Sequence, residues 1–175
     1  MSLEGKTAVV IGASGQHNFG VAIAKALANE GAKVIVSGRR QAPLETLASE
    51  IGGIAIPCDM GEEASIQSLF QSASEQAGPI HIAINSAGAL AGNPIAALTR
   101  EAIQPTLDVS FIGALLMFKY AAEVMTEGGS IMTISSLTAR LPGPGLAVYA
   151  AARAGIDYAI KIAAVEYGEQ NIRFN

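Results

Sequence analysis

Two parts of this sequence carry residues whose types and spacing could do chemistry. A glycine-rich run, Gly12-Ala-Ser-Gly-Gln-His-Asn-Phe-Gly20, lies between an apolar run and an alanine-rich run. Much further along the chain, Tyr149 is followed by Arg153. On a helix this i,i+4 spacing places both side chains on one face, so that a phenol and a guanidinium reach the same point. The first pattern suits the binding of an anion, and the second suits a proton donor beside a fixed cation.

The segments around the glycine-rich run predict how it would bind an anion. Thr7 to Ile11 is an apolar run without polar alternation, which indicates a strand buried on both faces. Val21 to Ala28 has apolar residues at helical spacing. A strand that leads through a glycine-rich turn into a helix aims free N–H groups at one point, and the usual anion there is a dinucleotide pyrophosphate. An ordinary turn is the alternative, because a glycine pattern alone is weak evidence.

The rest of the chain continues this alternation of strand and helix. We expect further strands over 32–36, 54–57, 80–84, 130–134 and 171–175, and further helices over 41–51, 62–76, 105–125 and 148–167. The alternation predicts a doubly wound α/β fold, in which helices cover both faces of a parallel sheet in a three-layer, Rossmann-like sandwich with strand order 3-2-1-4-5-6. Ligands bind outside the carboxyl ends of the strands in such sheets, so the loops there should meet at one cleft.

Composition limits the other classes of function. The 175 residues, 50% hydrophobic and 15% charged, fit one domain over 1–175 with a substantial core. A formal net charge of −4 argues against a nucleic-acid partner, and the longest apolar run, 111–118, is too short to cross a bilayer. Cys58 is the single cysteine, which excludes an internal disulfide and favours the cytoplasm. Glu4 and Lys6 leave no room for a signal peptide before the first strand, and we expect no metal site.

Five features in chain order resemble the short-chain dehydrogenase/reductase family, the NAD(P)-binding oxidoreductases that include 3-oxoacyl-acyl-carrier-protein reductases. They are the glycine-rich run, Asp59 after the third strand, Asn85-Ser-Ala-Gly88 after the fourth, Ser136 after the fifth, and Tyr149 with a basic residue four positions on. The resemblance covers the whole chain. It implies an enzyme that transfers a hydride between a nicotinamide dinucleotide and a small carbonyl or alcohol substrate.

The resemblance also implies which residues bind the cofactor. The glycine-rich run is two residues longer than the family's Gly-x-x-x-Gly-x-Gly form and has Asn18 at its middle glycine, where asparagine tolerates a positive φ. This length is similar to that of the divergent enoyl-acyl-carrier-protein reductases. His17 could contact phosphate, although a solvated loop position is the simpler interpretation. The expected cofactor contacts are Gly12, Ser14, Asn18, Phe19, Gly20, Arg39, Arg40, Asp59, Met60, Asn85, Ala87, Gly88, Tyr149 and Arg153.

The end of the second strand predicts which dinucleotide binds. Family members that prefer NAD have an acid where this chain has Gly38, and Arg39 and Arg40 follow it. Two guanidiniums without a carboxylate favour a 2′-phosphate, so we expect NADP(H) in preference to NAD(H). Two solvated surface arginines are the alternative. Asp59 is expected at the adenine amine with Met60 beside the base, and a helix N-cap is the alternative for Asp59.

Reduction of a carbonyl needs a hydride and a proton for the developing alkoxide. By resemblance, Tyr149 is the acid/base and Ser136 holds the substrate oxygen. Arg153 stands where the family has lysine, and it keeps the charge but cannot release a proton. Ser110 stands where the family has asparagine, and we expect it to lack the length and the backbone kink that hold a relay water. A slowed or altered reductase is therefore expected, with a dinucleotide-binding pseudoenzyme or sensor as the alternative.

Three further expectations concern the ends and faces of the fold. The helices over 105–125 and 148–167 are similar to those that pair family members, which implies a homodimer or homotetramer. Family members continue past the sixth strand with a helix and a last strand, so the last part of the fold is expected to be missing from these residues. His81, within an apolar strand, is interpreted as core or edge packing, and Cys58 as a buried small hydrophobe.

Overall fold

The computed structural model describes residues 2–15 and 18–175. The suggested contact of His17 with phosphate lies outside these residues. The strands are β1 (Thr7–Ile11), β2 (Lys33–Gly38), β3 (Ile54–Pro57), β4 (Ile82–Asn85), β5 (Gly129–Thr133) and β6 (Ile172–Phe174). The α-helices are α1 (Phe19–Asn29), α2 (Gln41–Ile51), α3 (Glu63–Ala77), α4 (Arg100–Leu107), α5 (Gly113–Val124) and α6 (Ala147–Glu166). Shorter helical turns are η1 (Ile95–Ala97), the π-helical η2 (Asp108–Ile112), η3 (Leu137–Ala139) and η4 (Gly168–Gln170).

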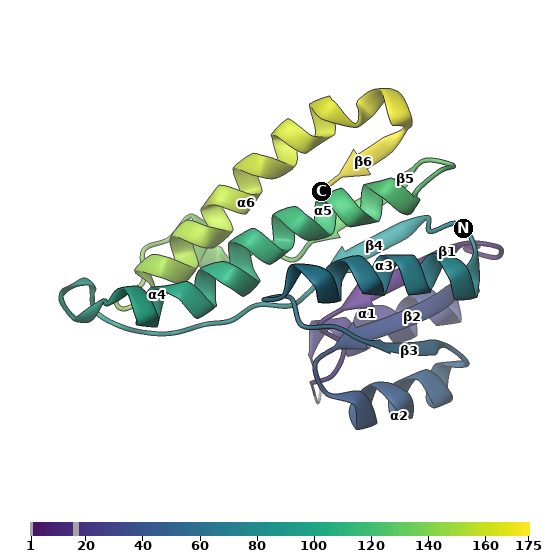
Figure 1. Ribbon diagram of the computed structural model, residues 1–175, viewed down its shortest axis with the longest axis horizontal. Coiled ribbons are helices and arrows are strands. Elements are labelled where there is room, and N and C mark those ends of the chain that lie inside the picture. The colour runs from purple at the N-terminus through teal and green to yellow at the C-terminus, as the bar shows by residue number, and fades with distance from the viewer. Residues whose placement is uncertain (1, 16–17) are drawn as a thin grey trace.

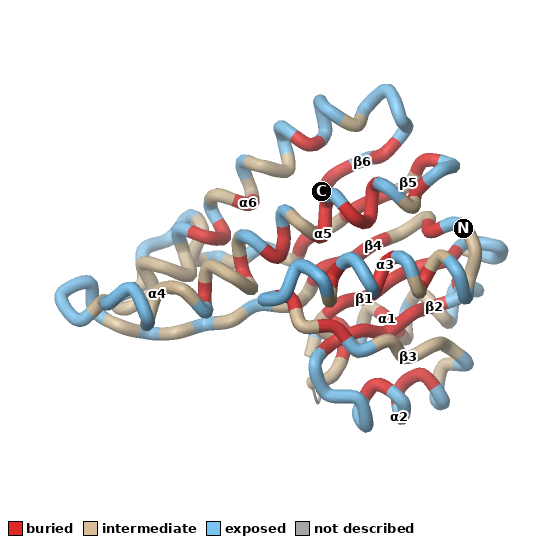
Figure 2. Tube along the Cα trace, in the orientation of Figure 1, coloured by how far each residue is buried: buried red, intermediate tan, exposed pale blue. Residues whose placement is uncertain are grey.

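The described strands form one parallel sheet in the order β3-β2-β1-β4-β5-β6, which confirms the predicted topology. Helices cover both faces (Figure 1), and the buried residues concentrate on the strands and on the helix faces that pack against them (Figure 2). Along β1 every residue is buried, as the lack of polar alternation predicted. Val9 and Ile11 pack into the core shared with α3, α5 and α6, whereas Val10 packs into the core shared with α1 and α2. Successive side chains of one strand therefore serve the two faces of the sheet.

The expected long helix from Pro105 to 125 is wrong at its start. Helix α4 begins at Arg100, because Thr99 accepts the N–H of Ala102 at 3.2 Å and caps the first turn. Pro105 lies inside α4, where it removes one backbone donor. The wider π-helical turn η2 then joins α4 to α5. Most other elements begin or end within two residues of the predicted positions.

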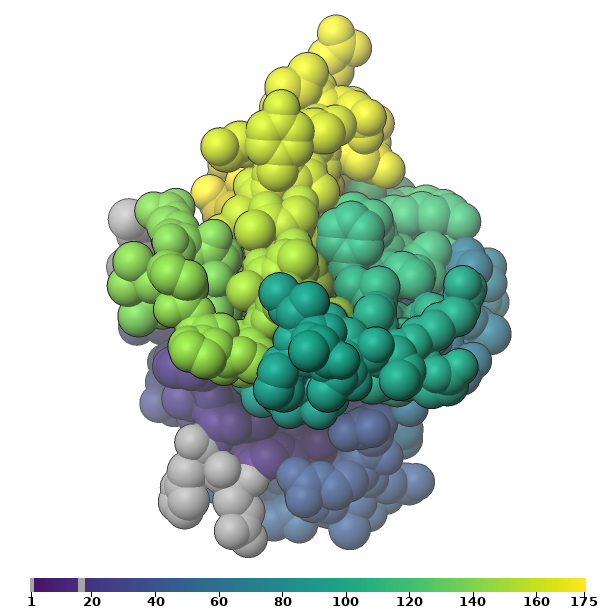
Figure 3. Space-filling model, turned by 90° about the vertical axis from the view of Figure 1, so that its left-hand side faces the viewer, coloured from purple at the N-terminus to yellow at the C-terminus, as the bar shows by residue number. Residues whose placement is uncertain are grey.

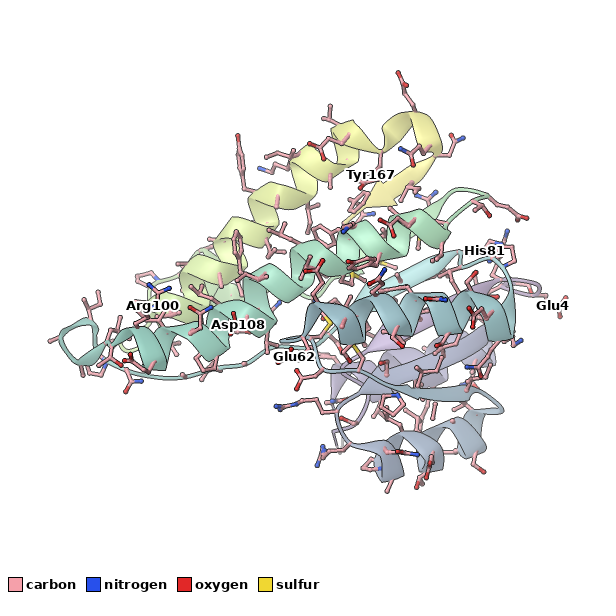
Figure 4. All side chains as sticks on the ribbon, in the orientation of Figure 1. Glu4, Glu62, His81, Arg100, Asp108 and Tyr167 are labelled. Carbon is pink, nitrogen blue, oxygen red and sulfur yellow. The ribbon has the colours of Figure 1, made fainter. Side chains whose placement is uncertain are left out.

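His81 lies at the amino end of the sheet, just before β4 rather than inside it. Its Nδ1 accepts the N–H of Thr7 at 3.1 Å, and its Nε2 is 3.5 Å from the carboxylate of Glu127. Figure 4 shows His81 at the opposite end of the molecule from Arg100 and Asp108. His81 therefore joins β1 to β4 far from the loops that follow the strands.

Two features are absent from the residues that the structure describes. None of the helices has the length and hydropathy that crossing a bilayer requires. No group of three or more His, Cys, Asp or Glu side chains lies close enough together to hold a metal ion within residues 2–15 and 18–175.

Candidate functional site

A cleft of about 470 Å³ opens at the carboxyl edge of the sheet, where the fold predicts a ligand site. Figure 3 looks onto this edge and shows the purple first part of the chain between the blue segments below it and the teal to yellow-green later chain above it. The loops after β1, β2, β3 and β4 line the cleft. The candidate cofactor residues in its lining are Gly12, Ser14, Asn18, Arg39, Arg40, Asp59, Met60, Ala87 and Gly88. Phe19, by contrast, is 71% exposed and is not part of the lining.

The loop after β1 passes close to two other segments, which explains its glycines. Gly12 has φ +88°, and a Cβ there would lie 2.7 Å from the backbone nitrogen of Ala87. A Cβ on Gly20, which is buried at the start of α1, would lie 2.6 Å from the carbonyl oxygen of Gly12. A side chain at either position would push β1, α1 and the segment after β4 apart.

Asn18 does not use the positive φ that the sequence analysis assigned to it. Its φ is −98°, and it is the N-cap of α1, where its side chain accepts the N–H of Val21 at 2.9 Å. Its amide also donates to the carbonyl of Gly12 at 2.6 Å. Asparagine thus ties the start of α1 to the end of β1 through its side chain rather than through its backbone.

The end of β2 places two cations at the cleft. Arg40 donates through Nη2 to the carbonyl of Ser14, which ties it to the glycine-rich loop. Arg39 has no hydrogen-bond or ion-pair partner within the described part of the chain. Gly38 leaves little room for the acid of an NAD-preferring enzyme, because a Cβ there would lie 2.8 Å from Oγ of Ser14. This corner of the cleft therefore carries positive charge.

The loop after β3 contributes Cys58, Asp59 and Met60 to the cleft. Burial raises the pKa of the Cys58 thiol to about 11, although a hydrogen bond with Ser65 opposes this shift. Cys58 is therefore the buried, neutral small hydrophobe that was expected. Asp59 accepts the N–H of Gly61 at 2.9 Å and does not cap α3, whose N-cap residue is Glu62. The helix-cap alternative for Asp59 is therefore wrong.

The segment after β4 forms the opposite wall of the cleft. Asn85 is fully buried, and its Oδ1 accepts the N–H of Ala87 at 2.9 Å, while its Nδ2 has no hydrogen-bond partner among the described residues. Ser86, which was not singled out from the sequence, donates its hydroxyl to the carbonyl of Ile11 at 2.7 Å. Its signal was available, since it is a hydroxyl directly after a strand that pairs with β1. Val109 of η2 also lines the cleft, which no sequence pattern indicated.

Tyr149 and Arg153 meet at Gly88, as their i,i+4 spacing on α6 predicted. Arg153 is 3% exposed, and its Nη2 donates to the carbonyl of Ala87 at 2.7 Å. Its guanidinium carbon lies 5.2 Å from the centroid of the Tyr149 ring. Its Nε and Nη1 are buried and have no partner within the described residues. Burying such donors is costly unless a ligand accepts from them.

Ser136 and Ser110 are both bonded within the protein. Ser136 Oγ lies 2.9 Å from Oγ1 of Thr138, and no hydrogen bond joins Ser136 to Tyr149 among the residues that the structure describes. Ser110 is fully buried in η2, where its hydroxyl bonds to both backbone groups of Ala89. The expectation that serine would not allow a kinked backbone is wrong, since the π-helical turn includes Ser110.

The fold and the cleft define a doubly wound α/β protein with a ligand site at the carboxyl edge of its sheet. The family model described as Enoyl-(Acyl carrier protein) reductase matches residues 12–175. The chain belongs to the short-chain dehydrogenase/reductase family of oxidoreductases.

Proteins similar to this chain include oxidoreductases of different kinds. An uncharacterized oxidoreductase of Methylorubrum extorquens is 34% identical over 99% of this chain and 71% of its own length. The NADH-dependent enoyl-acyl-carrier-protein reductase FabI of Bacillus subtilis is 33% identical, with 99% of this chain and 71% of that protein covered. A crystal structure of a dehydrogenase/reductase from Sinorhizobium meliloti superposes with a TM-score of 0.93 at 32% identity, over 99% of this chain and 71% of the other.

Proposed function

We propose that this protein is an NADP(H)-dependent oxidoreductase that reduces a carbonyl, or oxidises the corresponding alcohol, with Tyr149 as the acid/base. The observation that carries the proposal is the pairing of Tyr149 with the buried guanidinium of Arg153 beside Gly88, a residue of the cleft lining. A phenol beside a permanent cation at a ligand cleft is suited to proton transfer.

The residues of the cleft fit a nicotinamide dinucleotide. Gly12 and Gly20 carry no side chain where the end of β1 packs against the start of α1, so a pyrophosphate could approach the backbone there. Asp59 and Met60 would hold the adenine, and Ala87 and Gly88 would form the wall for the nicotinamide half. Asn85 is fully buried behind this wall and would support it through its bond to Ala87. The unpartnered N–H groups of Arg153 and Asn85 would donate to hydroxyl or amide oxygens there. When bound, the nicotinamide supplies or accepts the hydride.

The preference for NADP(H) rests on the end of β2. Arg39 lines the cleft without a partner among the described residues, and Arg40 follows at the start of α2. A guanidinium suits a 2′-phosphate, and Gly38 supplies no carboxylate for a ribose diol. The relative FabI is named as NADH-dependent, so this preference separates the chain from that relative.

The protein's own groups would handle the proton. The Tyr149 hydroxyl would protonate the alkoxide that develops on the substrate, and the charge of Arg153 would stabilise the tyrosinate that remains. Ser136 would hold the substrate oxygen by turning its hydroxyl away from Thr138, its present partner. Since Arg153 cannot release a proton, reprotonation of Tyr149 would depend on solvent, which agrees with a slow enzyme.

A second candidate is reduction of the carbon–carbon double bond of an enoyl thioester. The extended glycine-rich loop and the description of the matching family model favour it. A third candidate, a dinucleotide sensor without turnover, is favoured by the arginine at position 153. All three candidates share the cofactor site, and they differ in what happens after NADPH binds.

A titration of NADPH and then of NADH, followed by nucleotide fluorescence, tests the shared cofactor site. The chain contains no Trp, so indole emission does not interfere. We expect tight binding of NADPH and weaker binding of NADH. Absence of binding by either dinucleotide would overturn the oxidoreductase proposal, and equal affinities would overturn the NADP(H) preference.

We also propose that the chain forms a homodimer or homotetramer through α5 and α6. Tyr158, Ile162 and Val165 are exposed on α6 at i, i+4 and i+7, so they form one apolar stripe. On α5 and the turn before it, Leu115 and Ile112 are exposed as well. Light scattering should show an oligomer that Val165→Asp dissociates, and a monomeric wild-type protein would contradict this arrangement.

A further inference from the structure

The segment Ala87–Ala89, between Asn85 of β4 and the loop that follows, is held almost entirely by side chains. The N–H of Ala87 donates to Oδ1 of Asn85 at 2.9 Å, and its carbonyl accepts from Nη2 of Arg153 at 2.7 Å. The N–H of Ala89 donates to Oγ of Ser110 at 3.1 Å, and its carbonyl accepts from the same hydroxyl at 3.2 Å. Three buried side chains thus satisfy all four backbone groups on either side of Gly88.

Two of these three side chains are those of Ser110 and Arg153. Ser110 and Arg153 come from η2 and α6, which are separate elements, yet both bond to this one short segment. Serine suits its place because one hydroxyl both donates and accepts. Arginine suits its place because one guanidinium nitrogen bonds the carbonyl of Ala87, while Nε and Nη1 are buried without a partner among the described residues. A lysine offers a single nitrogen instead.

Gly88 completes the arrangement. A Cβ on Gly88 would overlap Nη2 of Arg153 and would lie 3.7 Å from Cε2 of Tyr149. Because Arg153 is only 3% exposed, its guanidinium has little room to move away from a Cβ on Gly88. The requirement for glycine at position 88 therefore depends on the arginine at position 153.

We infer that Ser110 and Arg153 act together as positioning residues: they fix the Ala87–Ala89 wall of the cleft relative to Tyr149, and Arg153 makes glycine obligatory at position 88. Ser110 and Arg153 thus act as one coupled pair on the segment Ala87–Ala89. The support of the Ala87–Ala89 backbone follows from the hydrogen bonds of the protein itself, and its consequence for catalysis by Tyr149 rests on the proposed function.

Amide hydrogen exchange of the protein without dinucleotide tests the backbone part. Ser110→Ala removes the bonds to Ala89, and Arg153→Lys loses the direct bond to Ala87. Each variant should speed exchange in a peptide covering 85–90 by about tenfold or more, since local opening becomes easier. Exchange in β1 and β2 should stay unchanged. Unchanged exchange over 85–90 in both variants would overturn the inference, and Arg153→Lys serves alone if Ser110→Ala does not fold.

A double-mutant cycle tests the dependence of Gly88 on Arg153. Gly88→Ala should weaken NADPH binding by about tenfold or more in the wild-type background and by about threefold or less beside Arg153→Lys. Gly92→Ala is the matched control, because among the described residues the only atom within 4 Å of a Cβ there is the Gly145 carbonyl oxygen, at 4.0 Å. Equal costs of Gly88→Ala in both backgrounds would overturn the coupling.

The cycle remains informative if the proposed function fails. If no variant binds a dinucleotide, the same four proteins are compared by apo melting temperature, in which Gly88→Ala should again cost less beside Arg153→Lys. Loss of binding would then count against the proposed function alone, and additive melting temperatures would count against the coupling alone.

Discussion

Replacement of Arg39 by alanine should weaken the binding of NADPH to the cleft and leave the binding of NADH nearly unchanged. Arg39 lines the cleft and has no partner among the described residues, so its removal breaks no bond that the structure records in the protein itself. A hydrogen bond to a charged group contributes about 1.5–3 kcal/mol, which corresponds to a factor of about 10 to 150 in the dissociation constant. We therefore expect Arg39→Ala to weaken NADPH binding by about that factor. NADH, which has no 2′-phosphate, should bind within about twofold of wild type.

Arg40→Ala is the control, because Arg40 is tied to the carbonyl of Ser14 in the glycine-rich loop. Its loss should loosen a wall common to both dinucleotides and weaken both. Fluorescence titrations at low and high salt measure the affinity of each variant for NADPH and for NADH. The loss of NADPH affinity in Arg39→Ala should be smaller at high salt, because the Arg39 side chain is exposed. If Arg39→Ala weakens NADH as much as NADPH, or neither of them, the assignment of a 2′-phosphate site at the end of β2 is wrong.

Three other predictions concern stability and turnover. Burial raises the pKa of the Cys58 thiol to about 11, so the unfolded chain loses this proton at a lower pH than the folded protein does. The free energy of unfolding should therefore fall between about pH 9 and 11, by up to about 2–3 kcal/mol. Denaturant unfolding at several pH values measures this loss, which should be absent in Cys58→Ala. Gly20→Ala should lower the free energy of unfolding by about 1–3 kcal/mol and impair NADPH binding, because its Cβ would lie 2.6 Å from the carbonyl oxygen of Gly12. Gly168→Ala should be neutral in the same melts, because no atom of the described residues lies within 4 Å of a Cβ there. Ser110→Asn combined with Arg153→Lys should raise kcat by restoring a group that can release a proton, and no gain in steady-state assays would argue against an impaired relay.

The strand order and the position of the cleft could be predicted from the sequence because they depend on patterns that are local. Each strand is a short apolar run, each helix follows it at regular spacing, and right-handed crossovers leave few ways to assemble them. The glycine-rich loop, Asp59 and Gly88 lie at the cleft because each directly follows a strand. The i,i+4 relation of Tyr149 and Arg153 needed only the helix.

The errors arose where specific hydrogen bonds, near or distant in the sequence, accompany a local structure that the pattern of residues does not show. Asn18 was expected to need a positive φ, but the carbonyl of Gly12 and the N–H of Val21 hold it as an N-cap. The π-helical turn includes Ser110, whose hydroxyl bonds to Ala89, a residue of another segment. The start of α4 at Arg100 was missed because Pro105 was taken as a first-turn proline.

The most direct test of the central claim is NADPH consumption by the wild-type protein and by Tyr149→Phe, measured with a 3-oxoacyl thioester and with an enoyl thioester. The proposed function predicts that the wild type reduces the 3-oxoacyl thioester. It also predicts that Tyr149→Phe lowers kcat by about 100-fold or more while the dissociation constant of NADPH stays within about twofold. Full activity of Tyr149→Phe, or consumption of NADPH with the enoyl thioester alone, would contradict carbonyl reduction through Tyr149.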